Sequence, residues 1–128
     1  MQINMDYTDK IFLWLGKTSK TEQEFNEYFK LDYSENENKK ICGFCQDIEK
    51  RWYDEDFIGY IKFQNSVEIL EILKEVPINK TEKESVVEKC KEIGLNNANA
   101  VYWYSDEITP NPNISYNGLK YIGEYLAE

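Results

Sequence analysis

The stretch Lys10-Ile11-Phe12-Leu13-Trp14-Leu15-Gly16 decides the fold of this chain. Its unbroken apolar run predicts a β-strand that is covered on both faces, and the glycine closes it. Because a strand of this kind is buried on both sides, we expect it to lie in the centre of a sheet.

Three further stretches predict strands. Residues 57–63 and 100–104 are rich in β-branched and aromatic side chains, which favour extended structure. Residues 119–126 fit two patterns: Tyr121, Gly123 and Tyr125 alternate as in a strand, whereas the aliphatic side chains between them would also suit a short helix. We expect a strand there, paired with residues 101–104. Asn117-Gly118 just before it predicts a turn.

Four stretches predict helices. Thr21-Glu22-Gln23-Glu24 is a capping box, and Thr81-Glu82-Lys83-Glu84 repeats the pattern before a helix that ends at Gly94. Between them, residues 41–51 and 66–76 have helical spacing, with Ser66 as the expected cap of the second helix and Pro77 as its stop. The residues expected to face inward are Phe25, Tyr28 and Phe29, then Ile41, Cys45 and Ile48, then Val67, Leu70 and Leu73, and finally Val86, Cys90 and Ile93.

These elements predict the fold class. Strands and helices mix, and two helices follow one another between the second and third strands. We expect an α+β fold in a single domain over residues 1–128, with a mostly antiparallel sheet of about four strands and three or four helices packed against it.

The composition narrows the possible partners. With 24 Asp and Glu against 15 Lys and Arg, the formal net charge is −9. This charge argues against nucleic acid and anionic membranes as partners, and it favours a basic protein. The chain has no apolar run of about 18 residues that would predict a membrane span, and its amino terminus does not resemble a signal peptide. We expect a cytoplasmic protein.

The sequence offers little for catalysis. It contains no histidine, no glycine-rich phosphate loop and no EF-hand loop, so we expect neither an enzyme nor a bound cofactor or metal. Cys42-Gly43-Phe44-Cys45 is the exception, because a CxxC at the start of a helix can lower a thiol pKa and exchange disulfides. The motif follows a polar loop and no further ligands complete a zinc site. We favour buried structural thiols and keep redox and metal roles as alternatives.

The run Trp52-Tyr53-Asp54-Glu55-Asp56-Phe57, the acidic-aromatic segment, is the best candidate for a functional surface. Its carboxylates would face lysines and arginines of a partner, and its exposed rings would supply contact area. A polar loop at residues 32–40 would add further acids, and Tyr116 is another candidate anchor. The predicted partner-binding residues are Trp52, Tyr53, Asp54, Glu55, Asp56, Asp32, Tyr33, Glu35 and Glu37. The alternative is a solvated turn beside core aromatics.

Several short pieces of the chain resemble the immunity protein 22 family of bacterial polymorphic-toxin systems. They are Phe12-Leu13-Trp14-Leu15-Gly16, Glu24-Phe25-Asn26-Glu27-Tyr28-Phe29, Asp32-Tyr33, Phe44-Cys45-Gln46-Asp47, the acidic-aromatic segment and Leu119-Lys120-Tyr121-Ile122-Gly123. The resemblance implies an intracellular immunity protein that binds and blocks a cognate toxin, and many such toxins are basic nucleases. It carries no binding residues over to this chain. A cytosolic thiol redox protein and an acidic adaptor with a non-toxin partner are the alternatives.

Overall fold

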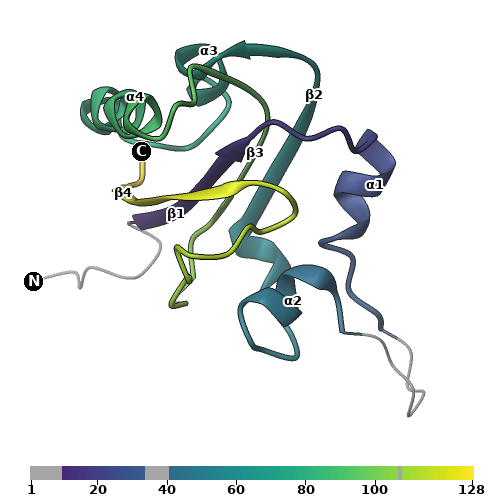
Figure 1. The fold of residues 1–128 in the computed structure, drawn as a ribbon. Helices are drawn as coiled ribbons and strands as arrows, with labels where there is room; N and C mark the ends of the chain where they lie inside the picture. Colours follow the sequence, from purple (N-terminus) through teal and green to yellow (C-terminus); the bar gives the residue numbers. More distant parts are fainter. Residues whose placement is uncertain (1–9, 34–40, 107) are drawn as a thin grey trace, which may run out of the picture.

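Four antiparallel strands form one sheet in the order β2-β3-β1-β4 (Figure 1). In this computed structural model, which describes residues 10–33, 41–106 and 108–128, the strands are β1 (Lys10–Gly16), β2 (Ile58–Glu68), β3 (Asn97–Tyr104) and β4 (Lys120–Leu126). β1 lies between β3 and β4, which confirms its predicted central place. The predicted α+β class is also confirmed, whereas one domain over residues 1–128 stays a prediction.

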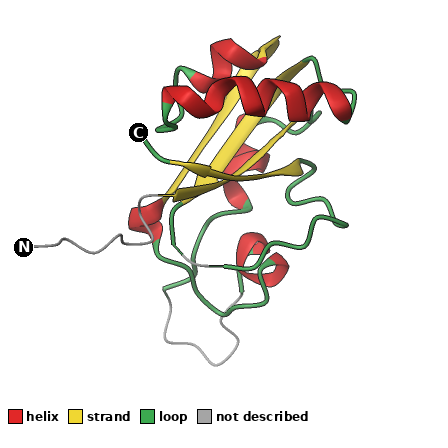
Figure 2. Cartoon of the chain, turned by 90° about the vertical axis from the view of Figure 1, so that its left-hand side faces the viewer, coloured by secondary structure: helices red, strands yellow, loops and turns green. Residues whose placement is uncertain are grey.

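Helices cover both faces of this sheet. Among the described residues they are α1 (Glu22–Glu27), α2 (Gly43–Asp47), α3 (Ile69–Leu73) and α4 (Lys83–Glu92), with short 3-10 helices η2 (Glu55–Phe57) and η3 (Lys80–Glu82). α3 and α4 follow one another between β2 and β3, as predicted. Figure 2 shows these two helices together on one side of the sheet, with other short helices and long loops on the other.

The alternating side chains of β1 build two hydrophobic clusters. Trp14 faces a cluster that includes Phe25 of α1 and Phe44 of α2. Leu13 faces the opposite way, into a cluster with α3 and α4 that includes Val86. Because successive side chains of a strand point to opposite faces, one apolar run supplies both cores. Each fully buried side chain of this size stabilises the fold by about 1.5–3 kcal/mol.

The two predicted capping boxes have different outcomes. At α1 the prediction is confirmed: the Thr21 hydroxyl accepts from the amide of Glu24 at 3.1 Å, and the Glu24 carboxylate accepts from the amide of Thr21 at 2.8 Å. These bonds lower the pKa of Glu24. At α4 the prediction is wrong, because Asn79 accepts from the amide of Thr81 at 3.0 Å and starts η3 instead. The N-cap position of α4 is Glu82.

The ends of α4 and α2 share one geometry. Gly94 ends α4 with a φ of 78°, and the amide of Leu95 donates to the carbonyl of Cys90 at 2.7 Å, which confirms the predicted left-handed cap. α2 ends in the same way, with Glu49 at a φ of 58° and the amide of Lys50 donating to the carbonyl of Cys45 at 2.9 Å. This cap ends α2 well before residue 51, where the predicted helix ended. Its predicted inward residue Ile41 lies outside the helix and is exposed.

Two further expectations are corrected by pairing across the sheet. β2 extends to Glu68, since Val67 pairs with Ala98, so Ser66 lies in a strand and does not cap α3. The later start of α3 turns Leu70 outward. β4 is a strand, as predicted, but it pairs with β1 because both sides of β3 are already occupied by β2 and β1.

The turn predicted before β4 is confirmed. Asn117 and Gly118 have φ values of 56° and 82°, and Tyr116 and Leu119 exchange backbone hydrogen bonds of 2.9 and 2.8 Å. Positive φ at both central residues is the reason that Asn-Gly suits this turn. The buried Asn117 also donates from Nδ2 to the carbonyl of Phe25 at 3.1 Å, which fixes the turn against α1.

Candidate functional site

The acidic-aromatic segment joins α2 to β2 and is held by a hydrogen bond to β3 and by bonds within the segment. The amide of Asp54 donates to the Tyr104 hydroxyl at 3.0 Å, at the end of β3. The Asp54 carboxylate accepts from the amide of Asp56 at 3.0 Å, and the Asp54 carbonyl accepts from the amide of Phe57 at 3.0 Å. Asp54 therefore caps η2, and its carboxylate is engaged by the local backbone.

The predicted aromatic anchors separate into exposed and buried residues. Trp52 is 57% exposed, whereas Tyr53 is only 2% exposed and its ring packs edge-on against Phe44 at 5.1 Å. The Tyr53 hydroxyl donates to the carbonyl of Phe29, and burial raises the pKa of Tyr53. The prediction that Tyr53 offers its ring to a partner is therefore wrong, because the ring belongs to the core beneath α1 and α2.

Tyr116 is corrected for the same reason. Its side chain is fully buried, and its hydroxyl accepts from the amide of Asn111 at 2.7 Å. The ring lies 5.4 Å from that of Trp14, measured between centroids. Tyr116 fixes the loop that precedes β4 to the core and is not available as an anchor.

The structure brings the two predicted acidic segments together at one contact. Tyr33 is 68% exposed, and its hydroxyl donates to the carboxylate of Glu55. Glu55 and Asp56 are both exposed, whereas Asp32 is half-buried. The two remaining predicted acids, Glu35 and Glu37, lie outside the described residues. Among the described residues, the predicted site residues that are exposed are thus Trp52, Tyr33, Glu55 and Asp56.

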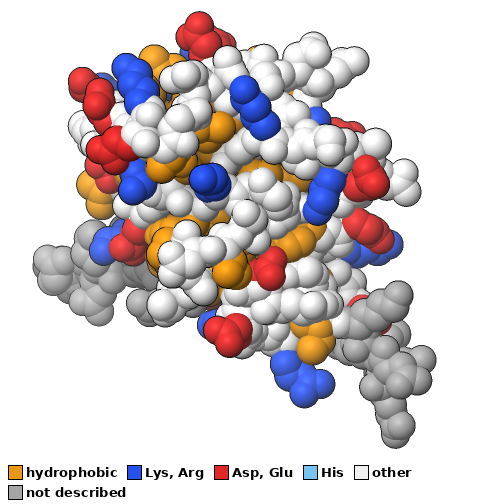
Figure 3. All heavy atoms as spheres, in the orientation of Figure 1, with side chains coloured by type: hydrophobic (Ala, Val, Ile, Leu, Met, Phe, Trp, Pro, Cys, Tyr) orange, Lys and Arg blue, Asp and Glu red, His pale blue; other side chains and the backbone are white. Residues whose placement is uncertain are grey.

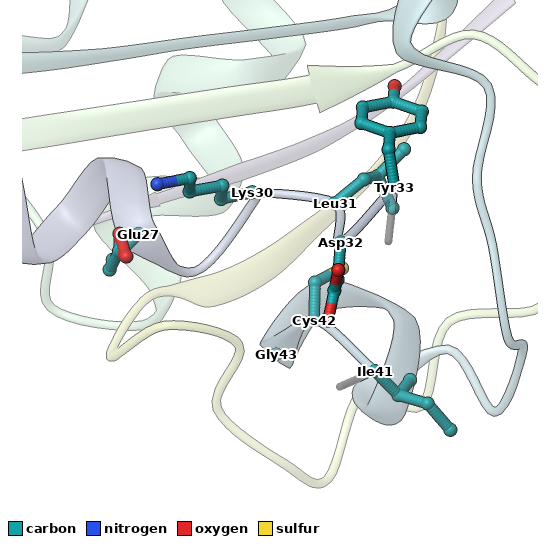
Figure 4. Close-up of a pocket in the computed structure, with 8 residues that line it drawn as sticks. All are labelled: Glu27, Lys30, Leu31, Asp32, Tyr33, Ile41, Cys42 and Gly43. Atoms are coloured by element: carbon teal, nitrogen blue, oxygen red, sulfur yellow. The ribbon is translucent and has the colours of Figure 1, made fainter. Parts of the chain in front are cut away.

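A hollow of about 590 Å³ lies between the end of α1 and the start of α2 (Figure 4). Its lining residues are Glu27, Lys30, Leu31, Asp32, Tyr33, Ile41, Cys42 and Gly43. Figure 4 shows Tyr33 and Ile41 pointing away from one another on its two sides. Because residues 34–40, which connect these sides, are outside the described part of the chain, we infer no ligand for this hollow.

A second hollow, the α1–β2 hollow, lies between α1, η2 and β2 and has a volume of about 540 Å³. Its lining residues are Glu22, Gln23, Asn26, Glu27, Phe29, Lys30, Glu55 and Tyr60. Of these, only Glu55 was predicted as a site residue. The five polar residues of α1 and its exit recur at helical spacing, so the sequence does contain a signal for the α1 wall. It contains no local signal that places Tyr60 beside them.

The CxxC cysteines are buried at the start of α2. Cys42 is the N-cap, its sulfur accepts from the amide of Cys45 at 3.2 Å, and the two sulfurs lie 2.8 Å apart as free thiols. Burial, followed by the hydrogen bond with Cys42, raises the pKa of the Cys45 thiol to about 12. Thiol redox catalysts need the opposite shift, toward a reactive thiolate. This environment favours structural thiols.

Comparison with known proteins shows the family to which the chain belongs. The family model described as Immunity protein 22 matches residues 11–128. The chain belongs to the immunity protein 22 family. Searches of curated proteins and of solved structures gave no significant match for this family member.

One face of this immunity protein 22 family member carries mixed charges. Figure 3 shows acidic and basic side chains interspersed on one face, with hydrophobic side chains between them. On this face a binding surface is therefore better sought in local groups of residues than in one continuous acidic patch. Within the described part of the chain, no group of His, Cys, Asp and Glu is arranged to hold a metal ion, and no helix could cross a membrane.

Proposed function

We propose that this protein is an immunity protein that binds a cognate polymorphic toxin and neutralises it in the cytoplasm. The observation that carries the proposal is the family match over residues 11–128, which includes every described strand and helix apart from the first residue of β1. In this function the protein acts by occupying a surface of the toxin and performs no chemistry of its own.

The partner is proposed to be a basic toxin of the nuclease type. The net charge of −9 supports this choice, because a nuclease must attract a polyanion and so carries lysines and arginines near its substrate site. The acidic immunity protein is attracted to those lysines and arginines, and the attraction acts mainly through faster association. The proposed contact surface is Trp52, Glu55 and Asp56 with Tyr33, because these are exposed and lie in segments joined by the Tyr33–Glu55 hydrogen bond.

The test is binding to the toxin encoded next to this gene. We expect the double variant Glu55→Lys/Asp56→Lys to weaken binding by about tenfold or more, because it places cations against the basic residues of the toxin. Glu55 and Asp56 are preferable to Asp54, since Asp54 caps η2 and its replacement would disturb the segment. Calorimetric titration at about 50 and about 200 mM salt measures both affinity and its salt dependence.

The matched control is Glu84→Lys/Glu88→Lys on the exposed side of α4, which changes the net charge by the same amount. It lies on the helix pair that covers the other face of the sheet. Equal weakening by both double variants would show a general charge effect and exclude the acidic-aromatic segment as the interface. Absence of binding by the wild-type protein, together with no protection of cells that express the toxin, would contradict the proposed function itself.

A further inference from the structure

We propose that the α1–β2 hollow receives the cationic side chain of an arginine or lysine from the partner protein. The inference rests on the proposed function for the identity of the partner, and it names the group that the partner inserts. It assigns roles to Glu22, Glu27 and Tyr60, none of which belongs to the acidic-aromatic segment.

Two stacked aromatic rings line the hollow. The ring of Tyr60 in β2 is stacked on Phe29, with centroids 4.2 Å apart and an angle of 9° between the planes. Phe29 is 1% exposed, whereas Tyr60 is 37% exposed and borders the hollow. Phe29 also packs edge-on against Phe25, at 5.6 Å. Because one face of the Tyr60 ring is covered by Phe29, only its remaining exposed surface can meet a cation, and a ring that is already packed loses little side-chain freedom on binding.

The rim of the hollow is acidic. Glu22 and Glu27 extend from α1, and Glu55 comes from η2 on the other side, so carboxylates flank the tyrosine from two separate elements. Among the described residues that line the hollow, Lys30 is the only cationic one, which leaves two negative charges in excess when the three carboxylates are counted. The amide groups of Gln23 and Asn26 complete the polar wall.

These features fit a guanidinium or ammonium group better than a neutral or anionic one. Carboxylates form short, strong hydrogen bonds with either cation, and an arginine can also stack its planar group on an aromatic ring. The flexible stem of such a side chain covers apolar surface while its charged end stays at the rim. The hollow is large enough for the side chain together with part of the segment that carries it.

A direct test uses a small probe in place of the toxin. Nα-acetylarginine methylamide carries the guanidinium, and Nα-acetylcitrulline methylamide is its neutral counterpart of nearly the same shape. In a titration followed by 1H–15N correlation spectra, we expect the arginine probe to shift the amide signals of Gln23, Asn26 and Tyr60, with weak, millimolar affinity. The citrulline probe should leave these signals unchanged. Equal shifts with both probes, or shifts confined to other elements, would overturn the inference.

We expect two variants of residues that line the hollow to change the affinity for the arginine probe in opposite directions. Glu27→Gln keeps the size of an exposed side chain and removes one carboxylate, so it should weaken probe binding by about threefold. Lys30→Gln removes the competing cation and should strengthen binding by a similar factor. Glu88→Gln on α4 is the matched control and should have no effect. Magnesium chloride at matched ionic strength should not reproduce the shifts. Changes of the same sign for Glu27→Gln and Lys30→Gln would contradict the assigned geometry.

The toxin itself separates this inference from the proposed function. If the toxin binds the wild-type protein and Glu27→Gln weakens that binding more than Glu88→Gln does, both stand. If the toxin binds equally well to both variants, the hollow is not its contact, while the proposed function remains. If the toxin fails to bind at all, the proposed function fails, and with it the toxin as the source of the side chain, even where the arginine probe occupies the hollow.

Discussion

Gly59 in β2 lies opposite Trp103 in β3, and the indole ring occupies the place where a side chain would begin. A Cβ atom at position 59 would lie 2.1 Å from Cζ2 of Trp103, far inside van der Waals contact. The backbone of Gly59 has no special conformation that requires glycine. Space alone therefore excludes a larger residue, and this is a property of two strands that meet only in the folded protein.

We expect Gly59→Ala to lower the free energy of unfolding by about 1–3 kcal/mol, because the added methyl group forces the indole out of its position. Urea denaturation followed by far-UV circular dichroism measures the change. In the double variant Gly59→Ala/Trp103→Leu the smaller side chain makes room, so the two losses should sum to more than the loss of the double variant. Simple additivity would show that the indole does not cause the strain.

The burial of the Tyr53 side chain could not be predicted from the sequence. Trp52 and Tyr53 are neighbours in an acidic run, and nothing in their local pattern separates them. The structure buries Tyr53 because its hydroxyl reaches the carbonyl of Phe29, a residue in a different segment, and because its ring fits against Phe44. Trp52 has 57% of its surface exposed.

At the scale of elements, two stretches with the same Thr-Glu-x-Glu pattern form different helix starts. Thr21-Glu22-Gln23-Glu24 forms a capping box at α1, whereas Thr81-Glu82-Lys83-Glu84 does not form one at α4. The difference arises upstream of the second pattern, where Asn79 accepts from both the amide and the hydroxyl of Thr81. Asn79 lies there because its amide donates to the carbonyl of Leu126, at the end of β4, and because Ile78 forms a bridge with Ala127.

This contrast predicts different costs for the same substitution. Thr21→Ala should destabilise the protein by about 1 kcal/mol, because it removes the acceptor for an amide at the start of α1. Thr81→Ala should cost less than about 0.5 kcal/mol, since the Thr81 side chain caps no helix in the structure. Thermal and urea unfolding of the two variants under the same conditions measure the difference. Equal costs would mean that Thr81 supports α4 in solution after all.

At the scale of the whole molecule, burial sets the response to alkaline pH. Cys90 on the inner face of α4 is fully buried, and burial raises the pKa of its thiol from 9.0 to about 11. Between these values the unfolded chain loses the proton while the folded protein keeps it. The native state then binds more protons than the unfolded state. The contribution of Cys90 to the free energy of unfolding is therefore fully present below pH 9 and is lost as the pH rises toward 11. Burial also raises the pKa values of Tyr104, Tyr121 and Tyr125, each to about 12, which adds to the loss at higher pH.

We expect the wild-type free energy of unfolding to fall with pH above about 9, with a contribution from Cys90 of up to about 1.4 kcal/mol per pH unit. Cys90→Ala should be less stable at neutral pH because it leaves a small cavity, yet its stability should depend less steeply on pH. Urea titrations at about pH 8, 9 and 10 in the presence of a reducing agent measure both quantities. Identical slopes for the two proteins would contradict a raised thiol pKa in the fold.

The sequence by itself determined the features that depend on neighbours along the chain. The apolar run of β1, the cap at Thr21, the left-handed cap at Gly94 and the turn at Asn117-Gly118 each follow from a few consecutive residues, and each is confirmed. Such patterns act through backbone conformation and nearby hydrogen bonds, which are the same in most folds. The resemblance to the immunity protein 22 family belongs here too, since the family match covers residues 11–128.

Only the tertiary structure decided the features that join distant segments. β4 pairs with β1 through contacts such as Leu13 with Gly123, and hydrophobic alternation alone does not choose between two possible partner strands. The α1–β2 hollow needs α1, η2 and β2 to meet, and the ring of Tyr53 packs against Phe44 of α2 and Tyr104 of β3. These contacts form when chain entropy is lost in exchange for packing of the whole core, so no local stretch of sequence contains them.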